Sequence, residues 1–149
     1  MLQELGPQSY HLLLEARLNG GEPAMLVVDT GASRSVVDAQ LMPTAVPTAD
    51  AIEAYGISTD SVQVQVAQGV ELCLCDGQWT QRVDLAVADL SALRELYKST
   101  CGINIVGLLG CDFLLAHCST INLGRRTLTL RRADRRGAKI VDKNSPHTI

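Results

Sequence analysis

The sequence is poor in aromatic side chains and contains no long apolar run. Phe, Trp and Tyr make up 3% of its 149 residues, so a core must be built from aliphatic side chains, which are plentiful in a chain that is 46% hydrophobic. No apolar run reaches the roughly 18 residues that a membrane-spanning helix needs. The length is that of one domain with a substantial core.

Signals for targeting, metal binding and disulfide bonding are also missing. The first twenty residues contain Glu4 and Glu15 and no basic segment, so we expect no signal peptide. The five cysteines form no Cys-x-x-Cys pair, and the trio Cys111, His117 and Cys118 fits no common zinc spacing. We therefore expect no metal, no cofactor and no membrane partner, and reduced cysteines favour a cytoplasmic protein.

Basic charge is scarce over most of the chain and gathers at its end. Residues 1–124 carry five basic and fourteen acidic side chains, whereas residues 125–149 carry eight basic and two acidic ones. A basic tail can bind nucleic acid, but this one has no aromatic residues for base stacking. We favour a solvated tail, or one that contacts the acidic body of its own dimer. The expected division is a domain over residues 1–131 and a weakly ordered tail over 132–149.

Short strands dominate the expected secondary structure. Residues 9–18 and 24–29 flank the turn signal Asn19-Gly20-Gly21 and predict a hairpin. Alternating or β-branched patterns predict further strands over 35–37, 62–66, 70–75, 80–88, 103–109, 120–123 and 127–130, with short helices over 90–98 (Asp89 as N-cap) and 111–117. The chain is therefore mainly β, a barrel or sandwich-like closed sheet with one or two short helices.

The most informative stretch is Ala24-Met25-Leu26-Val27-Val28-Asp29-Thr30-Gly31-Ala32, in which an apolar run leads directly into Asp-Thr-Gly. The run predicts a buried strand, Gly31 permits a tight turn, and Asp29 is left at the rim of the core. Two carboxylates held close together share one proton, so that one activates water and the other polarises a carbonyl. The chain has one Asp-Thr-Gly, so a second Asp29 must come from an identical chain across a two-fold axis. The alternative is a turn aspartate that caps its own loop.

A second motif, Gly107-Leu108-Leu109-Gly110-Cys111-Asp112-Phe113-Leu114, follows later in the chain. With Val27-Val28-Asp29-Thr30-Gly31-Ala32, and in this order, it makes the chain resemble the retropepsin-like aspartic peptidases, the single-domain clan that includes retroviral proteases and bacterial relatives. Those proteins pair an apolar Asp-Thr-Gly-Ala strand with a later apolar-apolar-Gly segment and a short helix. The closing hairpin, 121–123 to 128–130, also fits. The resemblance covers about residues 9–131 and implies a closed retropepsin-like (acid-protease) β-barrel of the bacterial type.

The resemblance also implies roles for individual residues. Asp29 would be the catalytic aspartate, Thr30 would brace the pair across the two-fold axis, and Gly31 would contact substrate through its backbone. Support behind the active strand would come from Leu108, Leu109 and Gly110. The site walls and the flap that closes over the peptide would be formed by Ala32, Tyr55, Gly56 and Ile57. The flap departs from the glycine-rich retroviral pattern, since Ser58-Thr59-Asp60-Ser61 follows Gly56.

These observations favour a homodimeric aspartic endopeptidase that hydrolyses a peptide or protein substrate. The alternative is a catalytically silent dimeric peptide-binding or scaffold module of the same fold, which the glycine-poor flap favours. Ala32 cannot donate a side-chain hydrogen bond to the dyad, so we expect a weaker acid and an optimum nearer mildly acidic or neutral pH. Arg34 and Asp112 follow the two motifs and could form an ion pair or remain solvated.

Overall fold

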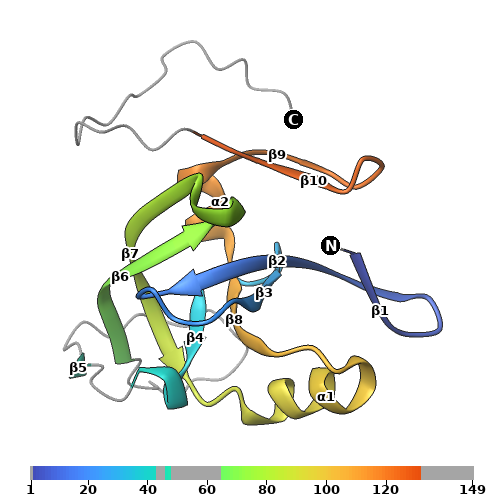
Figure 1. Ribbon diagram of the computed structural model, residues 1–149, viewed down its shortest axis with the longest axis horizontal. Helices are drawn as coiled ribbons and strands as arrows, with labels where there is room; N and C mark the ends of the chain where they lie inside the picture. The colour runs from blue at the N-terminus through green and yellow to red at the C-terminus, as the bar shows by residue number, and fades with distance from the viewer. Residues whose placement is uncertain (1, 43–45, 48–64, 132–149) are drawn as a thin grey trace.

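The computed structural model describes residues 2–42, 46–47 and 65–131, and these build a mainly β fold (Figure 1). Two α-helices and two short 3₁₀ turns interrupt the strands. The strands are β1 (Leu2–Gly6), β2 (Ser9–Leu18), β3 (Ala24–Val28), β4 (Val36–Asp38), β5 (Val46–Pro47), β6 (Gln65–Leu74), β7 (Trp79–Ala88), β8 (Ile105–Leu109), β9 (Cys118–Asn122) and β10 (Thr127–Leu130). The helical elements are η1 (Ala39–Leu41), η2 (Cys75–Gly77), α1 (Ser91–Cys101) and α2 (Cys111–His117).

The main sheet closes on itself, as the sequence predicted. Its eight strands run in the order β1-β2-β3-β8-β4-β7-β6-β5, and an additional pairing of β2 with β6 joins its two sides. Strands β2, β3, β8, β4, β7 and β6 thus form a closed barrel. Strands β9 and β10 form a separate two-stranded sheet beyond α2 (Figure 1).

The alternation of side chains along β3 divides the core. Leu26 belongs to a cluster with Leu72, Leu109 and Phe113, which α2 helps to cover. The next residue, Val27, packs instead with Leu13, Ile105 and Tyr97 of α1. Successive side chains of a strand point to opposite faces. The strand that leads to Asp29 is therefore fixed by apolar packing on both sides.

Several local predictions are confirmed. Strand β2 spans the predicted residues 9–18, and α2 spans the predicted 111–117. Helix α1 runs further than the predicted 90–98 and ends at Cys101, because Gly102, with a φ of 70°, provides a left-handed C-cap. The side chain of Asp89 accepts a hydrogen bond from the Ser91 N–H, although Leu90 occupies the N-cap position.

One prediction of strand boundaries is wrong, and one strand was not predicted. The separate strands expected over 62–66 and 70–75 belong, within the described residues, to one strand, β6. A register shift between Ala67 and Val70 accommodates Gly69, whose φ is 61° and whose N–H donates to the Asp84 carboxylate at 2.8 Å. Strand β1 was not expected at all, and it pairs with the start of β2.

No helix of the described residues is long and apolar enough to cross a membrane.

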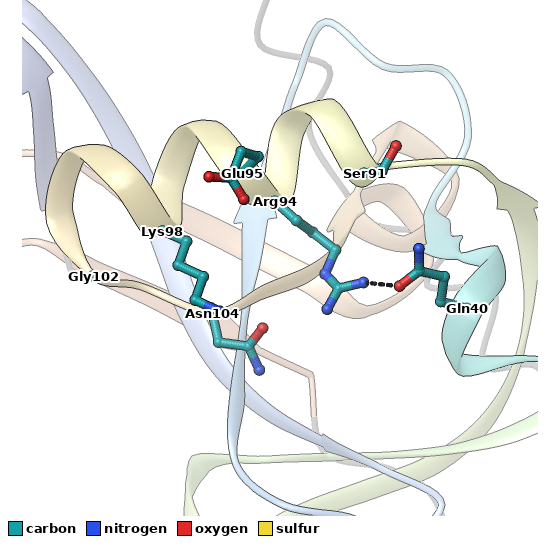
Figure 2. A pocket seen from close by; sticks show the side chains of 7 residues that line it. All are labelled: Gln40, Ser91, Arg94, Glu95, Lys98, Gly102 and Asn104. Carbon is teal, nitrogen blue, oxygen red and sulfur yellow. Dashed lines mark hydrogen bonds between the residues drawn. The ribbon is translucent and has the colours of Figure 1, made fainter.

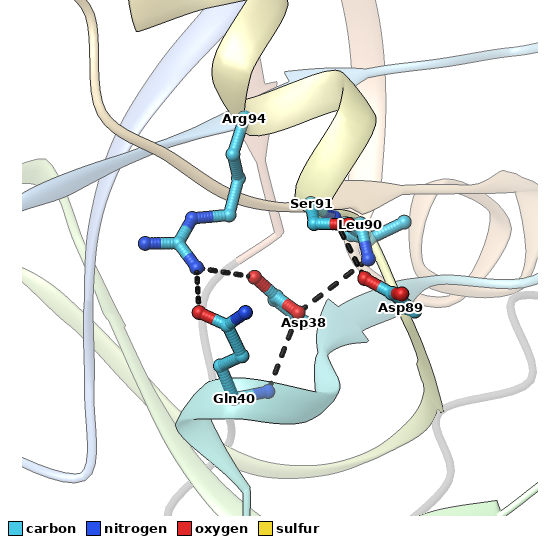
Figure 3. A network of polar contacts seen from close by, with 6 residues as sticks. All are labelled: Asp38, Gln40, Asp89, Leu90, Ser91 and Arg94. Carbon is cyan, nitrogen blue, oxygen red and sulfur yellow. Dashed lines mark hydrogen bonds and ion pairs between the residues drawn. The ribbon is translucent and has the colours of Figure 1, made fainter.

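A buried ion pair connects β4 to α1 (Figure 3). The Asp38 carboxylate is fully buried and lies 2.7 Å from the Arg94 guanidinium. Its other oxygen accepts from the backbone N–H groups of Gln40 and Leu90 at 3.3 and 3.4 Å. The Arg94 guanidinium also donates to the Gln40 side chain at 2.7 Å. This network fixes the first turns of α1 against the barrel.

Candidate active site

Asp29 directly follows the last residue of β3, and a backbone hydrogen bond holds its main chain in place. Strand β3 pairs with β8 in parallel, and the Asp29 N–H donates to the Leu109 carbonyl at 2.9 Å. The Asp29 carboxylate is half-buried and accepts a hydrogen bond from the Gly31 N–H at 2.8 Å. The loop thus turns back on the carboxylate and fixes its orientation, while Thr30 and Gly31 remain exposed.

The second motif lies directly behind this loop. The Cys111 N–H donates to the Ala32 carbonyl at 2.8 Å, and the Asp112 N–H donates to the Ser33 carbonyl at 3.3 Å. The Cys111 thiol contacts the Thr30 carbonyl at 3.2 Å. The first turn of α2 therefore supplies the donors that the backbone of the Asp29 loop requires.

Gly110 makes this approach possible. A Cβ atom at Gly110 would lie 2.5 Å from the Arg34 carbonyl oxygen and 2.8 Å from that of Ala32. Gly107 has a similar constraint, because a Cβ atom there would lie 2.3 Å from the Val36 carbonyl oxygen. Neither contact distance is compatible with a side chain. The two glycines let β8 and the start of α2 pass close to the segment that follows Asp29.

A buried polar network completes the support of the loop. The Ser35 hydroxyl, 1% exposed, donates to the Asp112 carboxylate at 2.7 Å and accepts from the Gly110 N–H at 2.9 Å. The same carboxylate oxygen accepts from the backbone N–H groups of Ser35 and Phe113. Asp112 is thus occupied by Ser35 and the α2 backbone, and the alternative ion pair with Arg34 is not formed. Sequence reasoning missed Ser35, although a small hydroxyl residue beside an apolar strand was the available signal.

The structure brings most of the predicted site residues together. The loop residues Asp29, Thr30, Gly31 and Ala32 lie against Leu108, Leu109 and Gly110 through the β3–β8 pairing and the contacts given above. Tyr55, Gly56 and Ile57, the predicted flap, lie outside the described residues, as does the predicted tail over 132–149.

A pocket of about 660 Å³ opens beside Asp29. Its walls are mainly apolar and come from β1, β2, β3, β8, β9 and α1, with Val28, Leu93, Leu108 and Ile121 among them. Asp29 and Thr30 line it together with His11 and Tyr97, two residues that the sequence did not single out. A carboxylate at the edge of an apolar pocket is the arrangement expected of a site that holds an apolar ligand group.

The Tyr97 hydroxyl is hydrogen-bonded to His11 Nδ1, and the two rings meet edge to face at 5.7 Å. Burial raises the pKa of Tyr97 to about 12, with smaller contributions from Cys101 and from Asp29. Tyr97 therefore stays protonated at any pH near neutrality.

A second pocket, of about 500 Å³, differs from the first in character (Figure 2). It lies along α1 and is lined by polar groups, including Gln40, Arg94, Lys98 and Asn104. In Figure 2 the Arg94 guanidinium points to Gln40 rather than into open space. This pocket does not include Asp29 and shares no lining residue with the apolar pocket. The described residues contain no group of three His, Cys, Asp or Glu side chains placed to hold a metal ion.

A closed barrel that presents an Asp-Thr-Gly loop, supported from behind by a glycine and a short helix, is the architecture of a retropepsin-like domain. The retroviral aspartyl protease family matches residues 8–122, and the chain belongs to this family. The fold is similar to that of the retroviral protease-like domain of Ddi1 from Leishmania major, with a TM-score of 0.53 and 17% sequence identity over 80% of this chain and 87% of that one. The comparison with curated proteins finds no match.

Proposed function

We propose that this chain is an aspartic endopeptidase that works as a homodimer. The observation that supports this most directly is the fixed Asp29 loop, in which the carboxylate is oriented by Gly31 and faces an apolar pocket. A binding module would not need a carboxylate held in this way at the rim of the core. Membership of the retroviral aspartyl protease family agrees with the proposal.

The dimer follows from the chemistry. One carboxylate cannot act as general base and general acid at the same time, and the chain carries one Asp-Thr-Gly. The partner subunit's Asp29 would supply the second group across a two-fold axis, with Thr30 bracing the pair. One carboxylate of the pair would take a proton from water while the other, protonated, would polarise the scissile carbonyl. Neither a metal nor another cofactor takes part in this mechanism.

The remaining residues have roles that follow from their positions. Gly31 and Ala32 would contact the substrate backbone, and Leu108, Leu109 and Gly110 would hold the loop. Tyr55, Gly56 and Ile57 would form the flap. The five free cysteines among the described residues support a reducing, cytoplasmic site of action.

The test is peptide cleavage by the wild type and by Asp29→Asn. A mixture-based octapeptide library should be cleaved by the wild type and left intact by the variant. Asp76→Asn, in the exposed turn η2, is the matched control and should retain full activity. Binding of the same peptides without cleavage by either protein would instead favour the scaffold module.

Two solution measurements complete this test. Sedimentation equilibrium should detect a dimer, and a protein that stays monomeric with peptide present would contradict the shared dyad. The pH–rate profile should peak at mildly acidic or neutral pH, because Ala32 offers the dyad no side-chain donor. A maximum below about pH 3 would contradict that part of the proposal.

A further inference from the structure

We infer that His11 and Tyr97 are specificity-determining residues, which select substrate side chains with an apolar body and an uncharged hydrogen-bond acceptor at the tip. The inference rests on the proposed peptidase function and adds a substrate class to it. It comes from the pocket beside Asp29, where these two residues provide a fixed polar pair within largely apolar walls.

The pair is held in one arrangement. Tyr97 is fully buried, and a buried tyrosine hydroxyl needs a hydrogen-bond partner. Its partner is His11 Nδ1, which comes from a different element, β2. The edge-to-face contact of the rings further restricts the imidazole. Helix α1 therefore fixes the side chain of His11 at the wall of the pocket.

The proton positions follow from this contact. In this contact the phenol is the better donor and the neutral imidazole is the better acceptor, so the Tyr97 hydroxyl donates to Nδ1 and the imidazole proton lies on Nε2. When the imidazole is charged, Nε2 also carries a proton. His11 thus has Nε2–H left as a donor in both states. A group that meets it favourably must be a hydrogen-bond acceptor.

The surroundings narrow the class of side chain further. Val28, Leu93, Leu108 and Ile121 require an apolar body on the substrate side chain. Asp29 lines the same pocket, so an acidic tip would meet a like charge. An uncharged acceptor satisfies both conditions, and the phenol of tyrosine combines it with a large apolar ring. Two-fold symmetry would place one such pocket on each side of the cleaved bond.

The experiment compares kcat/KM for pairs of octapeptides that differ only in Tyr or Phe next to the cleaved bond. The wild type should prefer Tyr by about two- to tenfold, the range expected for one hydrogen bond. His11→Leu should bring this ratio to about one, and Tyr97→Phe, which keeps a ring in the buried position, should lower it. His117→Leu is the matched control and should keep the wild-type ratio, since His117 packs against Trp79 and Phe113 away from this pocket.

The possible results separate this inference from the proposed function. Equal kcat/KM values for the Tyr and Phe peptides, or the same Tyr-to-Phe ratio in His11→Leu as in the wild type, would overturn the inference. Either result would still agree with the proposed peptidase function. His11→Leu could instead change the dimer dissociation constant and leave the Tyr-to-Phe ratio of kcat/KM unchanged. The pocket would then bind the partner subunit rather than a substrate side chain, and the inference would be wrong. Absence of any cleavage would count against the peptidase. Binding of the Tyr and Phe peptides to Asp29→Asn, measured by calorimetry, would then decide the inference: a Tyr preference would support it and equal affinity would refute it.

Discussion

Replacing Gly110 with alanine should destabilise the fold strongly. The added Cβ atom would lie 2.5 Å from the Arg34 carbonyl oxygen, 2.6 Å from the Arg34 carbonyl carbon and 2.8 Å from the Ala32 carbonyl oxygen. All three are backbone atoms, which cannot rotate away as a flexible side chain can. Overpacking of a tight site costs about 1–3 kcal/mol, and a contact with backbone alone belongs at the upper end of that range. We expect a loss of about 3 kcal/mol.

Thermal unfolding followed by circular dichroism measures this loss. For a chain of this length, about 3 kcal/mol corresponds to a fall in Tm of roughly 10 °C. Gly6→Ala is the matched control, because a Cβ atom at Gly6 would meet nothing within 4 Å. All proteins are compared at one concentration, since the proposed dimerisation would also change Tm. A Tm of Gly110→Ala within 2 °C of that of Gly6→Ala would refute the packing argument.

Three further predictions concern the polar groups around the site. Ser35→Ala should lower the free energy of unfolding, measured in urea, by about 1–3 kcal/mol, because the Gly110 N–H loses its acceptor. The control Ser33→Ala, at an exposed position, should lower it by less than about 0.5 kcal/mol. Arg94→Met should lower the free energy of unfolding by about 2 kcal/mol or more in the same assay, since it leaves the Asp38 carboxylate buried without its cation. This loss is smaller than that expected for a fully buried ion pair, because the Arg94 side chain is 31% exposed. Burial first, and Arg131 second, lower the pKa of His117, so protonation favours the unfolded chain and stability should fall as pH drops below about 6.5. His117→Leu should make the unfolding midpoint less dependent on pH in that window, and an unchanged dependence would contradict the assignment.

Local parts of the fold could be predicted because their signals lie within short segments. The hairpin of β2 and β3 has an apolar pattern on each side of a glycine turn, and α2 follows a glycine that breaks a strand. Strand β1 was missed, because it is short and owes its structure to pairing with β2. The continuity of β6 was missed because Gly69 interrupts the alternation of side chains without ending the strand.

The site was predictable only in its first part. The Asp-Thr-Gly motif and the later glycine segment singled out Asp29 and Gly110 from the chain alone, and the structure places the two segments against each other. The partners of these residues come from distant positions, such as Asp112, which lies 77 positions from Ser35. The contact of His11 with Tyr97 spans 86 positions, and no local pattern indicates it. Tertiary structure decides such contacts, and a single sequence carries little trace of them.

The proposed dyad explains why the Asp29 loop is fixed so firmly within one chain. In a two-fold dimer, any displacement of the loop occurs in both subunits, so the separation of the two carboxylates changes by up to twice the displacement. A shared dyad would therefore require a loop that is already fixed within each subunit, and Gly31, Gly110 and the Ser35–Asp112 network hold it in place within one chain. The residues proposed to select the substrate, His11 and Tyr97, lie instead on β2 and α1. Substitutions at His11 or Tyr97 can thus change the preferred side chain while the backbone that positions Asp29 stays in place.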